Sequence, residues 1–169
     1  MSMKKLLSLV LAVWCVCALC ACGGSESGSA EKIKGAFAVP FEYSVTTHGI
    51  TFNYTKTPEL TEMVLTAPDT LNGLKVTRSA SGVTASYDGL VVTLPESTAR
   101  RLTALDDMIT RLPDAVDSCE YAIESETGRR TLLFGDGGTT YTLVCTEDGT
   151  PVTAKIQTPE KTYDYTFSG

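Results

Sequence analysis

Cysteine and histidine are the residue types of this sequence best suited to nucleophilic, redox or transition-metal chemistry. The chain has six cysteines and one histidine. Four cysteines lie in the stretch WCVCALCAC, residues 14–22, and the other two are Cys119 and Cys145. Together with His48, these two have neither the CxxC nor the HxxxH spacing that is typical of zinc sites. We therefore expect no metal site and no cofactor.

The sequence also lacks clear motifs for catalysis by histidine, serine or paired carboxylates. His48 lies in TTHG, which is typical of a turn, and no serine occurs in a G-x-S-x-G motif. Gly135-Asp136-Gly137-Gly138 lacks the spacing of a P-loop or an EF-hand and is better explained as a hairpin turn. The acidic pairs favour surface charge: they are Asp106/Asp107, Asp114/Asp117 and Glu147/Asp148. We predict that the protein is not an enzyme, since a hydrolase would need a serine and a carboxylate beside His48.

The N-terminal cysteines lie in a segment with the features of a secretory signal. Lys4 and Lys5 precede an apolar run of about 16 residues, Leu6–Ala21, which is shorter than the ~18–20 residues that span a bilayer. Leu19-Cys20-Ala21-Cys22 resembles the bacterial lipobox. The resemblance implies that residues 1–21 are a signal peptide and that Cys22 receives diacylglycerol, with palmitate as a typical further acyl group. The alternative is an ordinary secretory signal with incidental cysteines.

A lipid on Cys22 implies a lipoprotein anchored at the extracytoplasmic face of the bacterial cell membrane. Only Cys119 and Cys145 then remain as thiols, and both lie in segments predicted as strands. Second-neighbour strands are about 10 Å apart, beyond the ~7 Å limit for bridged Cα atoms, so free buried thiols are favoured over the alternative of a disulfide.

Net charge and composition restrict the classes of molecule that the protein can bind. Removal of Lys4 and Lys5 with the signal leaves 12 of the 14 basic residues against 20 acidic ones, a net charge of −8. Such a surface is repelled by nucleic acid and by anionic headgroups, so the membrane partner is reached through Cys22 alone. The Gly/Ser-rich stretch after it predicts a flexible tether over residues 22–35. The remainder, residues 36–169, suits one domain.

The hydrophobic period of this domain is two, which predicts strands. The expected strands are FEYSV, ITFNY, EMVLTAP, LKVTRSA, VTASYDG, LVVTL, CEYAIES, RTLLFG, YTLVCT, PVTAKIQ and TYDYTFS. One helix is predicted between them, from Glu96 to Leu112, with Pro113 as its stop. Its apolar stripe consists of Leu102, Leu105, Met108, Ile109 and Leu112.

One helix is too narrow to cover such a sheet. Ten or eleven strands at ~4.8 Å spacing span roughly 50 Å, whereas a helix covers about 10 Å. The sheet must therefore curl around the helix, fold into a sandwich, or leave an apolar hollow. We predict a mainly β (α+β) fold: a curved antiparallel half-barrel of about 10–11 strands with one main helix on its concave face.

This layout resembles the bacterial lipoprotein-localisation (LolA/LolB-like) family. The resemblance rests on FEYSVTTHGITFNY, on APDTLNGLKVTRSASGVTASYDGLVVTL, and on LVCTEDGTPVTAKI followed by TYDYTF. It implies a non-catalytic protein that binds lipid or lipoprotein acyl chains in its half-barrel. The residues expected to line that cavity are Phe52, Tyr54, Met63, Leu65, Tyr87, Leu105, Met108 and Ile109. The alternative is a protein-interaction or sensory lipoprotein with a filled core, whose protein partner is unknown.

Overall fold

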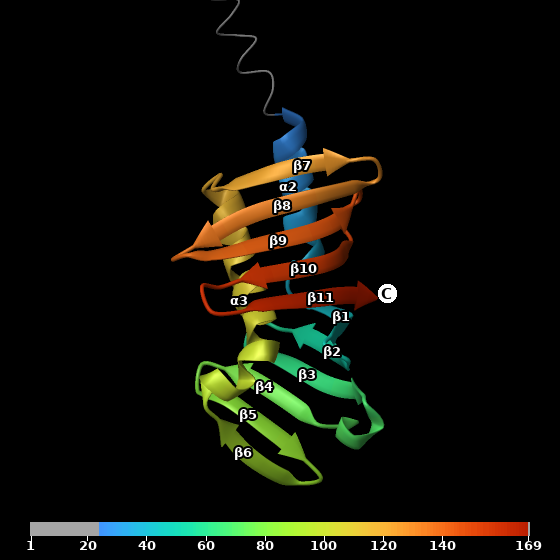
Figure 1. Ribbon diagram of the computed structural model, residues 1–169, viewed down its shortest axis with the longest axis vertical. Coiled ribbons are helices and arrows are strands. Elements are labelled where there is room, and N and C mark those ends of the chain that lie inside the picture. The colour runs from blue at the N-terminus through green and yellow to red at the C-terminus, as the bar shows by residue number, and fades with distance from the viewer. Residues whose placement is uncertain (1–23, 169) are drawn as a thin grey trace, which may run out of the picture.

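A computed structural model describes residues 24–168 as one antiparallel sheet that curves around two helices (Figure 1). The strands are β1 (Phe41–Thr47), β2 (Ile50–Lys56), β3 (Leu60–Ala67), β4 (Lys75–Ser79), β5 (Gly82–Tyr87), β6 (Leu90–Leu94), β7 (Tyr121–Glu126), β8 (Arg129–Asp136), β9 (Thr139–Thr146), β10 (Pro151–Gln157) and β11 (Thr162–Ser168). The helices are α2 (Gly24–Ala36) and α3 (Glu96–Asp117), with a short 3-10 turn, η1, at Asp69–Leu71. The prediction of an open, mainly β fold with a main helix is confirmed.

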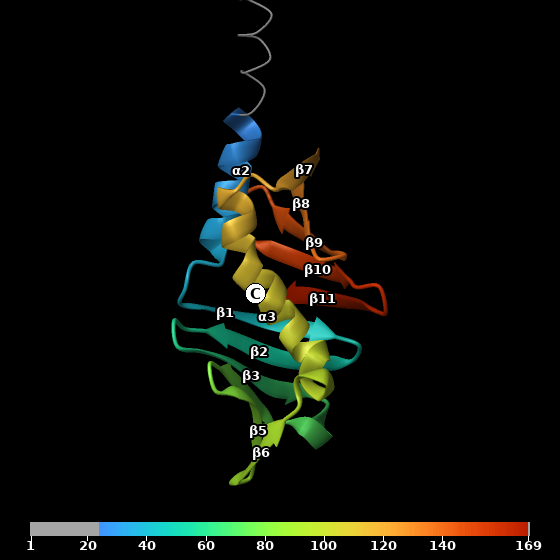
Figure 2. The same ribbon diagram turned by 90° about the vertical axis from the view of Figure 1, so that its left-hand side faces the viewer.

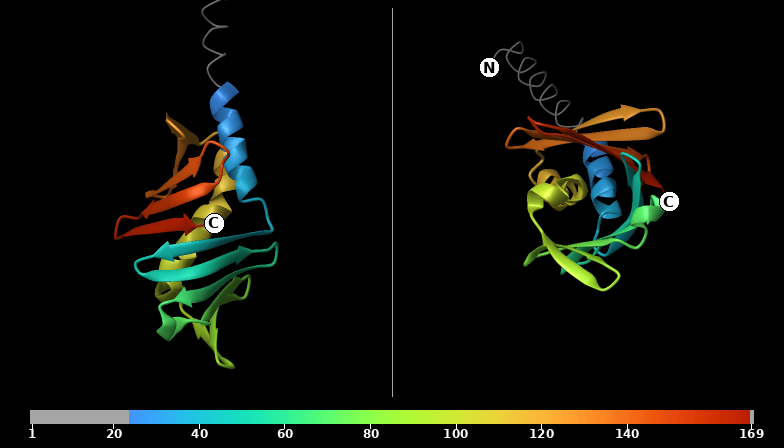
Figure 3. Two further views of the ribbon diagram at one scale, coloured as in Figure 1. Left: turned by 90° about the vertical axis from the view of Figure 1, so that its right-hand side faces the viewer. Right: turned by 60° about the horizontal axis from the view of Figure 1, so that its bottom comes forward.

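The sheet is built from two meanders joined at its centre. Its order is β6-β5-β4-β3-β2-β1-β11-β10-β9-β8-β7, so the first and last strands of the domain are neighbours. Val45 of β1 lies opposite Phe167 of β11 in this pairing. The two ends of the sheet, β6 and β7, do not pair with each other, and the view along the molecule shows both helices inside the curve (Figure 3).

The main helix crosses the concave face diagonally and is longer than predicted (Figure 2). It continues through Pro113 to Asp117, although a proline removes one backbone hydrogen bond of a helix. Two contacts hold the additional turn. Val116 is buried in the core, and Ser118 donates hydrogen bonds from both its N–H and its Oγ to the carbonyl of Asp114. Tertiary packing therefore outweighs the proline stop.

The prediction of a flexible tether over residues 22–35 is wrong for the described part of it, because Gly24–Ala36 is a helix. Ala30, Ile33 and the following Phe37 are buried, at spacings of three and four residues that place them on one face of the helix. The ring of Phe37 lies 5.5 Å from the rings of Phe41 and Tyr43. The sequence analysis missed these three apolar positions because the segment around them is rich in glycine and serine. Residues 1–23, including the signal and Cys22, lie outside the described residues.

Neither of the two helices in the described part of the chain is long and apolar enough to cross a membrane.

A close backbone approach fixes α2 to the sheet at Gly149, and its substitution tests whether α2 packs there. A Cβ at Gly149 would lie 2.7 Å from the carbonyl oxygen of Lys32 in α2. We expect Gly149→Ala to lower the free energy of unfolding by roughly 2–4 kcal/mol, since it combines a steric clash with a left-handed φ of 95°. The measurement is urea unfolding of residues 23–169.

Gly128→Ala is the matched control, because Gly128 has a similar φ of 78° but nothing within 4 Å of an added Cβ. Gly128→Ala should lower the free energy of unfolding by only about 1–2 kcal/mol, which is the cost of a left-handed φ for a residue with a Cβ. Equal losses for the two variants would contradict the packing of α2 on the loop before β10.

Candidate functional site

An apolar pocket lies beside the N-terminal turns of α3. Its volume is about 640 Å³, within the range of small-molecule sites of roughly 300–1,000 Å³. Segments far apart in the sequence enclose it: the β1–β2 turn, β4, β5, the end of β6, the first turns of α3 and the start of β11. The apolar lining consists of Ile50, Leu74, Val76, Ala85, Leu94, Ala99, Leu102 and Tyr163.

Small side chains on facing elements account for the space. Ala85 of β5 lies opposite Val76 of β4 and Val92 of β6 in the strand pairing, and it lines the floor of the pocket. Ala99 lines the pocket from the first turns of α3. Because alanine ends at Cβ, these two positions leave space between the helix and the sheet. Farther along α3, the side chains of Leu105, Met108 and Leu112 are fully buried in the core.

The pocket rim carries basic and hydroxyl side chains. Arg100, Lys161 and His48 come from α3, the β10–β11 turn and the β1–β2 turn, and all three are exposed. Ser97, Thr98 and Thr162 add hydroxyl groups. No aspartate or glutamate is among the described residues that line this pocket. The site can thus enclose an apolar group and hold a polar end at its mouth.

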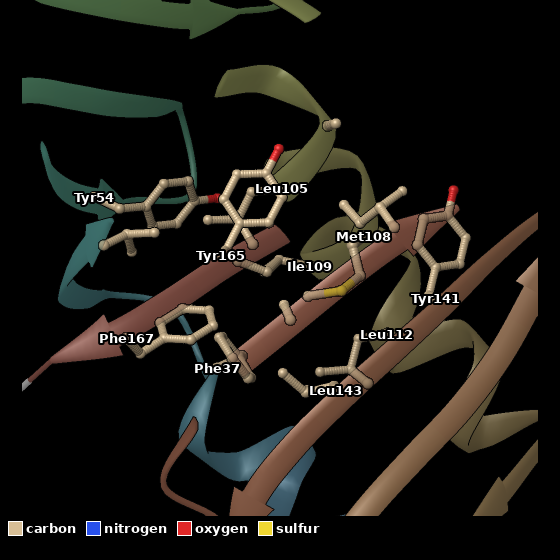
Figure 4. Close-up of a cluster of buried hydrophobic side chains, with 14 of the residues drawn as sticks. Phe37, Tyr54, Leu105, Met108, Ile109, Leu112, Tyr141, Leu143, Tyr165 and Phe167 are labelled. Atoms are coloured by element: carbon tan, nitrogen blue, oxygen red, sulfur yellow. The ribbon is translucent and has the colours of Figure 1, made fainter. Parts of the chain in front are cut away.

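The residues expected to line a cavity are mostly buried together in a filled core. Phe52, Tyr54, Met63, Leu65, Leu105, Met108 and Ile109 are at most 3% exposed and belong to one hydrophobic cluster. Figure 4 shows Met108 and Leu112 of α3 facing Tyr141 and Leu143 of β9. None of these seven lines the apolar pocket.

Tyr87, the eighth residue expected to line a cavity, is neither buried in the core nor part of the lining of the apolar pocket. Its side chain is 50% exposed at the end of β5, next to the turn that leads into β6. Alternation along VTASYDG correctly placed Val83 and Ala85 on the inner face. Tyr87 continues this alternation, but it is the last residue of β5 and remains half exposed.

A buried carboxylate next to the core was missed by the sequence analysis. Asp106 was expected on the solvated face of the helix, but it is only 4% exposed. Its Oδ1 accepts hydrogen bonds from the Tyr54 hydroxyl at 2.7 Å and the Thr61 hydroxyl at 2.8 Å. Lys56 Nζ also donates to Oδ1, and Arg78 donates to Oδ2 at 3.0 Å. The helix is thereby held to β2, β3 and β4 at once.

Strand register brings these donors together. Lys56, Thr61 and Arg78 occupy one row across β2, β3 and β4, because Lys56 lies opposite Thr61 and Thr61 lies opposite Arg78. Tyr54 is two residues before Lys56 and shares its face. The signal that could have indicated a buried carboxylate is this row of polar residues at inward-facing strand positions. The row can be recognised in the sequence only when the register of the three strands is known.

The network controls the ionisation of its members. Burial alone would raise the pKa of Asp106, but hydrogen bonds from Lys56, Tyr54 and Thr61 outweigh it, and the pKa lies below the ordinary value. Burial, with the charge of Asp106, raises the pKa of Tyr54 well above its ordinary value. Asp106 is therefore ionised and Tyr54 neutral at physiological pH, so neither is poised to transfer a proton.

The two described cysteines are free thiols in different environments, and the alternative disulfide is not formed. Cys145 in β9 is fully buried, and burial raises its pKa to about 12, so its thiolate is not available as a nucleophile. Cys119 was expected to be buried in a strand, but it is exposed in the turn after α3, with a φ of 57°. Among the residues whose side chains the structure describes, no group of three or more His, Cys, Asp or Glu is placed to hold a metal ion.

Comparison with known proteins found similarity at the level of structure. No protein-family model matches the chain, and no curated protein matches it in sequence. An uncharacterised conserved protein from Thermus thermophilus aligns with a TM-score of 0.49 at 11% identity, over 85% of this chain and 84% of that one. Lipoprotein LppX from Mycobacterium tuberculosis aligns with a TM-score of 0.47 at 11% identity, over 84% and 92%.

A third solved structure belongs to the family named in the sequence analysis. It is that of a LolA superfamily protein from Nitrosomonas europaea, which aligns with a TM-score of 0.42 at 12% identity, over 83% of this chain and 91% of that one. The likeness concerns the arrangement of the chain and assigns no ligand.

The Asp106 network predicts acid-sensitive stability. A group whose pKa is lowered by folding stabilises the protein above its unfolded pKa, about 3.9 for aspartate, and this contribution is lost as pH falls through the lower folded pKa. We expect Asp106→Asn to lower the free energy of unfolding by about 3 kcal/mol at pH 7, since Lys56 and Arg78 lose their buried counter-charge. The difference from wild type should shrink below pH 4.

Asp107→Asn is the control, because Asp107 is more exposed and its ion pair with Arg78 lies nearer the surface. It should cost less than about 1 kcal/mol. Urea unfolding of residues 23–169 between pH 3 and 7 measures both variants. A loss for Asp106→Asn that is equally small, or that does not change with pH, would contradict the network.

Proposed function

We propose that this protein is a lipid-anchored extracytoplasmic protein that binds an apolar ligand, a lipid or the acyl part of a lipoprotein, without catalysis. The pocket beside α3 carries the proposal. It has eight apolar lining residues, whereas a second pocket, of about 490 Å³ between α3 and β2–β4, is lined mainly by charged and hydroxyl side chains. The basic and hydroxyl groups at its rim suit a ligand with one apolar and one polar end.

The pocket volume of about 640 Å³ lies within the range of sites that hold small-molecule ligands, which suits one acyl chain. Each Å² of apolar surface that is removed from water contributes about 25 cal/mol, so the proposed binding rests on burial of the acyl group and needs no covalent step. Binding in this manner is passive, and the ligand leaves as it entered.

The location follows from the lipobox-like sequence at Cys22, which lies outside the described residues. Because α2 begins at Gly24, the domain would lie within about 7 Å of chain from a lipidated Cys22, with no long tether between them. The pocket elements β4 and β5 lie at the opposite end of the molecule from the start of α2 (Figure 1). This geometry supports a membrane-held acceptor or receptor better than a diffusing shuttle.

A second candidate is a protein-interaction or sensory role, and the edge strand β6 favours it. Leu90, Val91 and Val92 are 57–73% exposed on a strand without charged residues. Edge strands are usually protected by charge, as β7 is by Glu124 and Glu126. An extended segment of another protein could pair with this edge.

Filling the pocket tests the ligand-binding proposal. We expect Ala85→Phe to occupy the space opposite Ala99 and to reduce bound lipid at least tenfold, as measured by native mass spectrometry of residues 23–169 purified without detergent. Ala122→Phe on the exposed side of β7 is the control of equal added volume and should retain wild-type lipid. Both variants are first checked for a cooperative unfolding transition.

Two results would count against the proposal. One is wild-type protein without co-purified lipid that also fails to take up added fatty acid or lipopeptide. The other is a folded Ala85→Phe variant that carries as much lipid as wild type. Either result would favour the interaction role of the β6 edge.

The anchor is tested separately in the full-length chain. We expect Cys22→Ser to move the protein from the membrane fraction to the soluble extracytoplasmic fraction, because diacylglycerol then has no thiol to attach to. Cys20→Ser should leave it in the membrane fraction, since the position before the small residue of a lipobox is variable. Membrane fractionation after metabolic labelling with palmitate measures both, and unchanged labelling of Cys22→Ser would exclude Cys22 as the lipidated residue.

A further inference from the structure

We propose that the ligand of the apolar pocket is a single-chain amphiphile with an anionic headgroup, held by Arg100 and Lys161. This inference rests on the proposed function and names the chemical class of its ligand. The shared chemistry is a carboxylate or a phosphate at one end of one alkyl chain.

The charge around the pocket is the first argument. Arg100 and Lys161 are at its rim together with the imidazole of His48, and no carboxylate lines it within the described part of the chain. This contrasts with the chain as a whole, which has a net charge of −6. A pocket rim of one sign attracts ligands of the opposite sign and disfavours those of the same sign.

The pairing of basic residues is the second argument. Salt bridges between described residues use Lys34, Lys56, Lys75, Arg78, Arg111 and Arg130. Arg100, Lys161 and His48 do not take part in these ion pairs. A carboxylate or phosphate at the mouth would therefore gain two cationic partners without displacing one of these internal pairs.

The rim groups sit on ordered backbone rather than on a mobile loop. The β10–β11 turn is closed by a hydrogen bond from the Thr158 N–H to the Lys161 carbonyl at 2.9 Å, and the Lys161 N–H donates to Thr158 Oγ1 at 3.0 Å. Arg100 lies within the first two turns of α3, whose positive N-terminal dipole adds to the field at Ser97 and Thr98. The two cations are thus presented from different elements toward one opening.

Apolar lining and charge together select the class. The apolar side chains suit the alkyl chain, and the exposed basic and hydroxyl groups suit its polar end at the rim. An alkylammonium ion would meet like charge there, and an alcohol would gain only hydrogen bonds. An anion gains charge-assisted hydrogen bonds, which are about twice as strong as neutral ones.

Binding of four probes with the same alkyl chain tests this inference. Lauric acid, lauryl phosphate, lauryl alcohol and laurylamine are titrated into residues 23–169 below their micelle concentrations, with displacement of a fluorescent acyl probe as the readout. We expect at least one of the two anions to bind about five- to tenfold more tightly than the alcohol, and the amine to bind most weakly. The preference should fall with added salt because the cations are exposed.

Variants that remove the charges of Arg100 and Lys161 test whether these two residues cause the preference for anions. Arg100→Gln/Lys161→Gln should weaken binding of the anions by about five- to tenfold and leave the alcohol unchanged, since the apolar lining is intact. Arg129→Gln/Lys155→Gln removes the same charge at exposed positions that do not line the pocket and should change neither. All four positions are exposed, so folding is expected to be unaffected.

The outcomes separate this inference from the proposed function. Equal affinity for the anions, the alcohol and the amine would overturn the anionic class while supporting apolar ligand binding. A preference for anions that persists in Arg100→Gln/Lys161→Gln would also overturn it. Failure of all four probes to bind would overturn the proposed function as well.

Discussion

The burial of one carboxylate, Asp106, determines where the main helix lies. A charged group that is almost fully buried must be satisfied by hydrogen bonds, and its partners come from three adjacent strands. Such a network contributes little net stability compared with apolar packing, but any other position of α3 would leave the charge without partners. We interpret Asp106 mainly as the group that restricts α3 to one register across the sheet. The core and the pocket both follow from that register.

With α3 fixed at its middle, its two halves meet different surfaces. Toward β9, Met108 and Leu112 face Tyr141 and Leu143, and the space is filled (Figure 4). Toward β4 and β5, Ala99 and Ala85 are among the residues that line a pocket of about 640 Å³. The buried core and the proposed ligand site are thus on different parts of one helix. A filled core beneath the second half allows the first half to leave space without loss of the fold.

The second helix determines how the proposed lipid at Cys22 would hold the domain. Because Ala30, Ile33 and Phe37 are part of the core, α2 is a structural element of the domain and cannot act as a spacer. A lipid at Cys22 would then hold the β7 end of the sheet toward the bilayer and the β6 end away from it (Figure 1). The pocket and the uncharged edge strand β6 both lie in the part that is remote from this anchor.

The sequence by itself determined the features that depend on local pattern. Alternation along FEYSV and ITFNY predicted strands, and the Leu102–Leu112 stripe predicted α3. Only the tertiary structure decided what depends on contacts between distant residues. The stripe of α2 is too narrow to recognise without the sheet that buries it.

Asp106 became a buried anion because register aligned Lys56, Thr61 and Arg78 across three strands. The apolar pocket joins residues of β4, β5, α3 and β11, among them Ala85 and Ala99, whose small side chains leave space between sheet and helix. Local pattern fixes which face of an element is apolar, whereas the spacing between faces is set by pairing and packing along the whole chain.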